Sequence, residues 1–124
     1  MLNQEQIQNI RENQTVMIST ADTNGQPRSI VVIPSDISNN EMVISIIQSE
    51  KSFENLKQNP KCFINVYLVD SETQYKIEGI AEIFDDGDRF KQIKNYEESE
   101  NLPADLTVKA IAVIKFVTVE VSVG

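Results

Sequence analysis

Residues 15–33 read TVMISTADTNGQPRSIVVI, and this stretch indicates a β-hairpin. Its two arms, Thr15–Ala21 and Arg28–Ile33, are rich in β-branched residues, which pack well on a pleated sheet. The residues between them, DTNGQP at 22–27, contain an Asn-Gly pair, which favours a tight turn because both residues tolerate a positive φ. The two arms are therefore predicted to pair as neighbours in an antiparallel sheet.

Further along the chain, the sequence predicts additional strands that bring the total to six. They are Met42–Ile47, Cys62–Val69, Tyr75–Phe84 and Ala110–Val121. In the third of these, Gly79 interrupts an alternation of apolar and charged residues, which suits a bulge or a close backbone approach. The last is longer than the usual five or so residues and is expected to bend across a barrel. The residues expected on one face of it are Ile111, Val113, Val117, Val119 and Val121.

Helices are predicted only at the margins, over Asn3–Asn13, Glu50–Lys57 and Asp85–Ser99, each with a narrow apolar face. The links are short, and strands and helices do not alternate as in a parallel α/β fold. The sequence therefore predicts a mainly β protein, with residues 1–124 forming one domain folded as a six-stranded antiparallel β-barrel.

Charge and composition exclude several classes of partner. The net charge is −8, from 11 Lys plus Arg against 19 Asp plus Glu, whereas a nucleic-acid surface is normally basic. No apolar run approaches the ~20 residues of a membrane-spanning helix, and residues 1–5 lack the pattern of a secretory signal. We therefore expect no nucleic-acid partner and no membrane partner. One cysteine, Cys62, cannot form an internal disulfide, which favours a reducing compartment, and we expect a cytoplasmic location.

The chain contains no histidine, which rules out a Ser-His-Asp triad, a Cys-His dyad and a His-Cys zinc site. No catalytic side chain and no metal site are predicted. Cys62 lies in an apolar strand pattern, where a buried and inert thiol is expected. Any chemistry is therefore expected to come from a bound cofactor.

The start of the predicted helix at Glu50–Lys57 is a candidate phosphate site. Ser49 is the expected N-cap, which leaves Lys51 and the Ser52 hydroxyl in the first turn, beside unpaired backbone N–H groups and the positive end of the helix dipole. The alternative is an ordinary capped surface helix with a solvated lysine.

Arg28, at the head of its strand, is placed to reach the same anion as Lys51. The alternative is an ordinary arginine on an edge strand. The apolar run after it, residues 30–33, offers either a wall for a flat heterocycle or plain core packing.

The order and spacing of these segments resemble the pyridoxamine 5′-phosphate oxidase-like FMN-binding split barrels. The resemblance is carried by TAD at 20–22, GQPRSIVV at 25–32, QSEKS at 48–52, NL at 55–56, NP at 59–60 and YKIEGIAE at 75–82. It covers most of the chain, from about residue 15 to residue 84. The fold it implies is the FMN-binding split barrel.

The resemblance also implies FMN as cofactor and a homodimer that holds two FMN molecules at its interface. The cofactor-binding residues that it implies are Arg28, Ser29, Ile30, Val31, Ser49, Lys51 and Ser52. Among them, the arginine, the lysine and the hydroxyls at 49 and 52 contact the phosphate, and the backbone that follows the arginine lines the isoalloxazine ring. Glu50 stands where many relatives have a cation, which weakens the local positive charge.

One departure concerns the oxidase proper, whose C-terminal segment recognises its substrate with Trp, Arg and His residues. This chain has neither Trp nor His, so pyridoxamine phosphate oxidation is not expected, and the small FMN-binding members of the family match better.

Three functions remain open from the sequence. The first is an FMN-dependent oxidoreductase or electron-transfer protein, with a small redox substrate or a nicotinamide donor. The second is a non-catalytic flavin carrier or sensor, or an empty barrel that serves as an interaction module. The third uses deazaflavin or heme, and heme is disfavoured because no histidine is present as an axial ligand.

Overall fold

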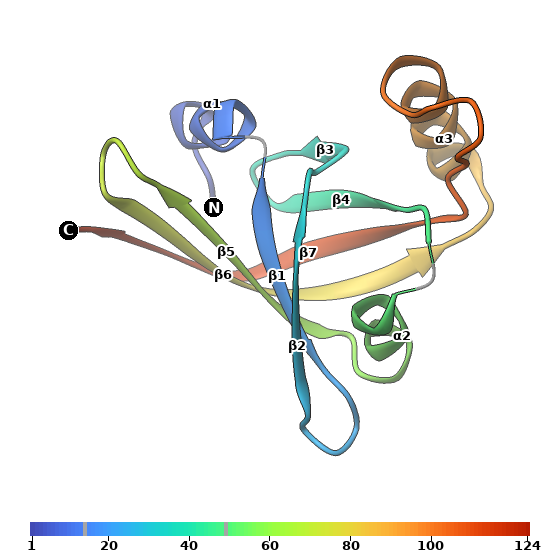
Figure 1. The fold of residues 1–124 in the computed structure, drawn as a ribbon. Helices are drawn as coiled ribbons and strands as arrows, with labels where there is room; N and C mark the ends of the chain where they lie inside the picture. The colour runs from blue at the N-terminus through green and yellow to red at the C-terminus, as the bar shows by residue number, and fades with distance from the viewer. Residues whose placement is uncertain (14, 49) are drawn as a thin grey trace.

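A curled antiparallel sheet organises the protein (Figure 1). The structure is a computed structural model that describes residues 1–13, 15–48 and 50–124. In sheet order the strands are β2 (Pro27–Val32), β1 (Val16–Ala21), β5 (Lys61–Leu68), β6 (Thr73–Phe84), β7 (Ala110–Val123), β4 (Glu41–Ile46) and β3 (Asp36–Ile37). The predicted mainly β, antiparallel split-barrel fold is confirmed. The described residues contain one strand beyond the predicted six, because the two-residue β3 has no sequence pattern of its own.

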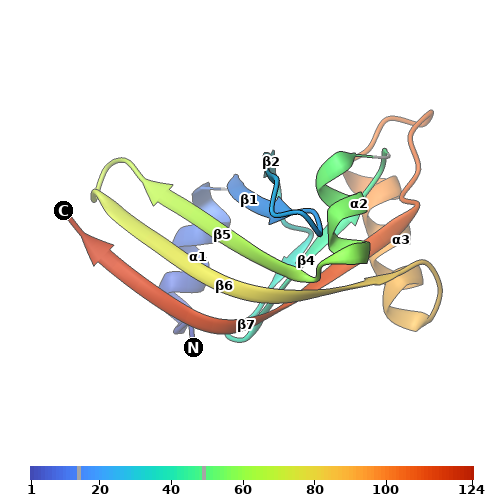
Figure 2. The ribbon, with the colours of Figure 1, turned by 90° about the horizontal axis from the view of Figure 1, so that it is seen from below.

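Three helices occur among the described residues: α1 (Gln4–Asn13), α2 (Lys51–Gln58) and α3 (Asp88–Glu100). α1 and α2 bury their apolar side chains in the main core, while α3 covers a second, smaller cluster against β4 and β7. The two views in Figures 1 and 2 show α1 and α3 at opposite ends of the curled sheet, with α2 beside β1 and β2. No helix in the described part of the chain is long and apolar enough to cross a membrane.

The β1–β2 hairpin forms as its turn residues predict. The pairing runs in register from Val16 opposite Val32 to Ala21 opposite Pro27. Gly25 adopts a φ of 83°, and its N–H donates to the carbonyl oxygen of Asp22 at 3.1 Å. The Asp22 carboxylate accepts two further backbone N–H bonds within the same turn. A positive φ without steric cost is the reason that glycine stands at this position.

Gly79 marks both a bulge and a close approach, as its place in the sequence predicts. The register between β6 and β7 shifts at Glu78 and Gly79, and Val117 has no partner in that pairing. A Cβ atom at Gly79 would lie 2.5 Å from Cγ2 of Ile114 and 3.2 Å from the carbonyl oxygen of Lys115. The bulge allows the long strands to bend. At Gly79, any side chain larger than hydrogen would clash with the neighbouring strand.

The same bulge overturns the single apolar face expected for β7. Because one extra residue reverses the alternation of side chains, Ile111 and Val113 pack in the α3 cluster, whereas Val119 packs against the main core. Val117, at the bulge, is 53% exposed. Strict alternation, which the prediction assumed, holds only up to this point.

A polar clamp joins α3 to the segment that leads into β7. Lys94 Nζ donates to Glu98 Oε2 and to the carbonyl oxygen of Val108, and Glu98 Oε2 also accepts the N–H of Val108. These hydrogen bonds, first of all that from Lys94, lower the pKa of the Glu98 carboxyl below its usual value. The clamp holds residues beyond α3 against the sheet, where some of them line the groove described below.

We expect Gly79→Ala to lower the free energy of unfolding by about 1–3 kcal/mol, because the added methyl group overpacks the contact with Ile114. Urea denaturation measures this change. Gly124→Ala is the control, because its Cβ would meet its nearest atom, the Glu72 carbonyl oxygen, at an ordinary 3.7 Å. Equal stability of the two variants would contradict the close approach.

Candidate cofactor site

An open groove of about 1050 Å³ lies between β2, the β3–β4 edge, α2 and α3. Its apolar walls come largely from residues 30–33, from Phe53 of α2 and from Leu102 after α3. Polar groups are spaced along it, among them Ser45, Glu50 and residues 96–97. A smaller cavity of about 550 Å³ lies near the start of α3 and includes none of the predicted site residues. The groove is therefore the better candidate for a cofactor.

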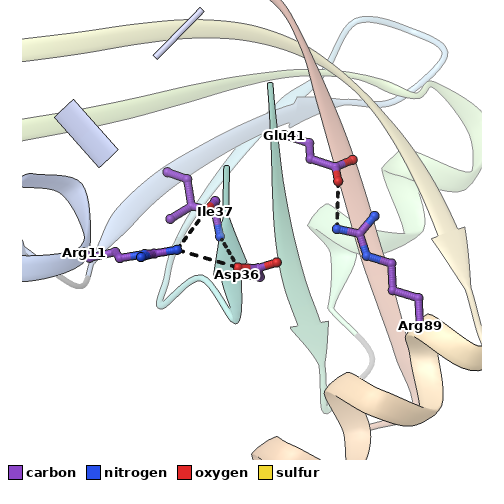
Figure 3. Close-up of polar contacts among 5 residues, drawn as sticks. All are labelled: Arg11, Asp36, Ile37, Glu41 and Arg89. Carbon is purple, nitrogen blue, oxygen red and sulfur yellow. Dashed lines mark hydrogen bonds and ion pairs between the residues drawn. The ribbon is translucent and has the colours of Figure 1, made fainter. Parts of the chain in front are cut away.

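Two ion pairs hold helices to the β3–β4 edge of the sheet (Figure 3). Arg11 Nη2 donates to the carbonyl oxygen of Ile37 at 3.0 Å and lies 3.9 Å from Asp36 Oδ1. Arg89 Nη2 donates to Glu41 Oε1 at 2.8 Å. Both arginines thus have acidic partners, and neither is a free cation for a ligand.

The start of α2 differs from the sequence prediction by one residue. Glu50, rather than Ser49, occupies the N-cap position, with extended backbone and no side-chain cap bond. Ser49 itself lies outside the described residues. The Glu50 carbonyl oxygen accepts the N–H groups of Phe53 and Glu54, each at 3.0 Å. The N–H groups of Lys51 and Ser52 precede these bonds and have no acceptor within the helix, as at any helix N-terminus.

The structure brings Arg28 and Lys51 to the same side of the sheet. Arg28 is directly opposite Thr20 in the β1–β2 register, so the two side chains share a face. Thr20 is buried on that face and accepts a hydrogen bond from Asn55 of α2, with Nδ2 and Oγ1 3.3 Å apart. Lys51 precedes Asn55 by four residues and therefore lies on the same side of the helix. The Arg28 side chain and the helix that begins with Lys51 therefore lie on the same face of the sheet.

Of the other predicted residues of β2, two line the groove and one does not. Ile30 and Val31 line the groove. Ser29 does not, and its hydroxyl pairs with that of Ser19 at 2.8 Å. Ser19 and Ser29 are register partners and stand next to the Thr20–Arg28 pair, so their side chains point to the opposite face. Only the backbone of Ser29 is therefore oriented to meet a ligand beside Arg28.

Ser52 is the feature of this region that points most directly to a ligand. Its side chain is 0% exposed, and its Oγ has no hydrogen-bond partner among the described residues. A buried hydroxyl without a partner costs about 1–3 kcal/mol. Arg28 and Lys51 are both exposed and make no ion pair within the described part of the chain. Cations without an ion pair and first-turn N–H groups are the kinds of group that bind a phosphate. Arg28, Lys51 and Ser52 are not among the residues that line the groove.

Comparison with known proteins identifies the family. The family model described as pyridoxamine 5′-phosphate oxidase matches residues 2–122. The chain belongs to the pyridoxamine 5′-phosphate oxidase family. No curated protein sequence matches it.

Solved structures share the fold of this family member at low sequence identity. A HupZ variant of Group A Streptococcus is 21% identical, with a TM-score of 0.87, and the match covers 98% of this chain and 100% of that one. An FMN-binding protein of Syntrophomonas wolfei is 21% identical, with a TM-score of 0.72 and coverages of 93% and 82%. HutZ of Vibrio cholerae, a heme storage protein, is 14% identical, with a TM-score of 0.71 and coverages of 99% and 95%. These likenesses show the fold alone.

Within this oxidase-family fold, Cys62 is as inert as the sequence predicts. It lies opposite Thr20 across the β1–β5 pairing and is buried. Burial raises the pKa of its thiol to about 12, so the reactive thiolate is scarce at neutral pH. Among residues 1–13, 15–48 and 50–124, no cluster of His, Cys, Asp or Glu side chains is placed to hold a metal ion.

Much of the groove was missed by sequence analysis. Tyr96 and Leu102, together with the loop residue Leu106, bring the α3 region to it, and Ser35 and Ser45 contribute a hydroxyl pair 2.6 Å apart. No local pattern marks these residues, because the sequences of a polar helix face and a short loop do not differ from those of other exposed segments. Only the position of α3 over the sheet assembles them.

We expect Ser52→Ala to keep or raise the free energy of unfolding of the ligand-free protein, by up to about 1–3 kcal/mol, because it removes an unpaired buried hydroxyl. Urea denaturation without added ligand measures this. Ser45→Ala is the control, since it breaks the hydrogen bond to Ser35 and should lower stability by about 0.5–1.5 kcal/mol. An equal loss in both variants would mean that the Ser52 hydroxyl is paired after all.

Proposed function

We propose that this protein binds FMN and uses it in oxidoreduction or electron transfer. The phosphate lies at the start of α2, and the isoalloxazine ring lies against β2. The observation that carries this proposal is the buried Ser52 hydroxyl, which has no hydrogen-bond partner among the described residues and follows Lys51 in the first turn of α2. Arg28 lies on the sheet face to which α2 is bonded. A phosphate monoester offers those groups several acceptor oxygens and close to two negative charges.

Local charge supports phosphate binding despite the net charge of −8. Distant acidic residues are screened beyond about 10 Å at physiological salt, whereas Arg28 and Lys51 contact the anion directly. The first-turn amides of α2 add a partial positive charge at the same place. Ser49 is proposed as a further hydroxyl donor. Glu50 opposes these groups, so the affinity is expected to be moderate.

The groove supports the ring end of the proposal. In this arrangement the backbone of Ser29, Ile30 and Val31 contacts the isoalloxazine, and apolar walls exclude water from it. Bound FMN supplies hydride and single-electron chemistry that side chains lack. The chain binds and orients the ring, and no histidine acid or base is required.

Flavin fits this chain better than heme does. HutZ stores heme, but the present chain has no histidine to serve as an axial ligand. The thiol of Cys62 is buried and protonated, which makes it a poor iron ligand. The lone buried cysteine also agrees with a reducing compartment, and we place the protein in the cytoplasm.

A second copy of the chain is proposed to complete the site. β2 lies at one edge of the sheet, and the neighbouring apolar residues Val31 and Ile33 are 62% and 66% exposed. Edge strands with exposed apolar residues are normally covered in a stable protein. The proposed dimer buries these side chains and closes the open side of the groove.

We expect the FMN-loaded protein to have twice the mass of the 14.0 kDa chain in solution. Val31→Glu should shift it toward the monomer, because burying an unpaired charge in the interface is unfavourable. Light scattering coupled to gel filtration measures both masses. Lys57→Glu, at an exposed position on α2, is the control variant. A wild-type monomer with bound FMN would overturn the dimer and leave FMN binding standing.

Titration with FMN and with riboflavin, which lacks the phosphate, tests the proposed function. FMN is expected to bind more tightly than riboflavin. Lys51→Ala should weaken FMN binding by about 1.5–3 kcal/mol, or roughly ten- to a hundred-fold, because a charge-assisted hydrogen bond is lost. Lys57→Ala, at the far end of the same helix, should bind like the wild type.

Three results separate the alternatives to this proposal. Failure to bind either flavin, or a heme or deazaflavin spectrum after purification, would overturn it. Unchanged FMN affinity in Lys51→Ala would remove that lysine from the site. Reduction of the bound flavin by a nicotinamide donor, with turnover on an added acceptor, separates an enzyme from a flavin carrier.

A further inference from the structure

We infer that Thr20 and Asn55 are positioning residues, which hold the two halves of the proposed phosphate site together without touching the cofactor. This inference rests on the proposed FMN function. The reason is the place of their hydrogen bond, which joins the strand pair that carries Arg28 to the helix that begins with Lys51.

The buried polar side chains gather at one contact. In the described part of the chain, the buried side chains that are polar or charged are Thr20, Ser52 and Asn55, which are 4%, 0% and 2% exposed. Thr20 lies on β1, Ser52 and Asn55 lie on α2, and the two elements pack against each other (Figure 1). Burying a polar group is costly unless it is hydrogen-bonded, and Thr20 and Asn55 meet this requirement through each other.

On the strand side, Thr20 sets the position of Arg28. The two residues are register partners, and the Cβ atoms of such pairs lie about 4.5–5.5 Å apart on one face of a sheet. A group fixed to Thr20 is therefore fixed relative to the base of the Arg28 side chain. Thr20 is also paired with Cys62 on its other side, so its place in the sheet is secured from both neighbours.

On the helix side, Asn55 sets the rotation of the first turn. Lys51 and Ser52 precede it by four and three residues, so both lie next to it on the same face of α2. Turning the helix by one residue would rotate that face by about 100° and remove both side chains from the site. The bond from Asn55 Nδ2 to Thr20 Oγ1 opposes such a rotation because it is directional.

Other groups on α2 supply this orientation only coarsely. Phe53 and Leu56, three residues apart, bury one face of the helix in the core and so determine which side faces the sheet, but apolar contacts lack the directionality of a hydrogen bond. The N-cap residue Glu50 makes no side-chain cap bond. Within the freedom that this packing leaves, the buried hydrogen bond from Asn55 to Thr20 sets the rotation of the eight-residue helix more closely.

Thr20→Val tests the inference, because it keeps the shape of the side chain and removes the acceptor. The measurement is the ratio of the FMN and riboflavin dissociation constants in the full chain. We expect FMN binding to weaken about five- to thirty-fold while riboflavin binding stays within two-fold, so that the preference for the phosphorylated flavin falls. Thr20→Ser keeps the hydroxyl and should keep the preference.

Two further variants separate positioning from stability. Thr20→Val combined with Asn55→Leu replaces the polar pair by an apolar one, which should regain stability and still lack the preference for FMN. Thr73→Val is the matched control, since its hydroxyl donates to Ser71 in the β5–β6 turn and it should bind both flavins normally.

The outcomes are distinct. A preference for FMN that is unchanged in Thr20→Val, an equal loss for both flavins, or a preference that returns with stability in the double variant would each overturn the inference. A wild-type protein that binds FMN no better than riboflavin would instead overturn the proposed phosphate site itself.

Discussion

α2 meets the β1–β2 hairpin through a buried hydrogen bond from Asn55 to Thr20, and the candidate site depends on that contact. The apolar face of α2 determines which side of the helix meets the sheet, but apolar contacts do not add the directional constraint of a hydrogen bond. Here a directional bond sets the register between helix and strand. It joins α2, which begins with Lys51, to the sheet face that carries Arg28, although the two residues are separated by more than twenty positions in the chain.

α2 packs against a sheet that is strongly curved. Gly79 allows β6 to approach β7 closely, and the bulge at Val117 bends the long strands and reverses their faces. Ile111 can therefore pack under α3, while Val119, further along the same strand, supports the main core. The groove exists because helices lie at separated places on this curved sheet, where a flat sheet would leave no concave space between them.

The chemistry open to such a site is limited by what the chain lacks. The chain has no histidine, and burial raises the pKa of its one thiol, so neither a histidine base nor a reactive cysteine is available. The described residues include a buried hydroxyl without a hydrogen-bond partner at the start of α2, and two cations, Arg28 and Lys51, that make no ion pair there. In the proposed function these groups bind the phosphate of a redox cofactor, and the cofactor supplies the reaction.

The sequence by itself determined the local elements: the Asn24-Gly25 turn, the interruption at Gly79, the buried Cys62 and the apolar faces of the helices. Each of these is decided by neighbours along the chain, through positive φ, strand alternation or helical spacing. Only the tertiary structure decided the N-cap at Glu50, the switch of faces in β7 and the groove. The physical reason is that burial and register depend on partners far along the chain, which no local pattern encodes.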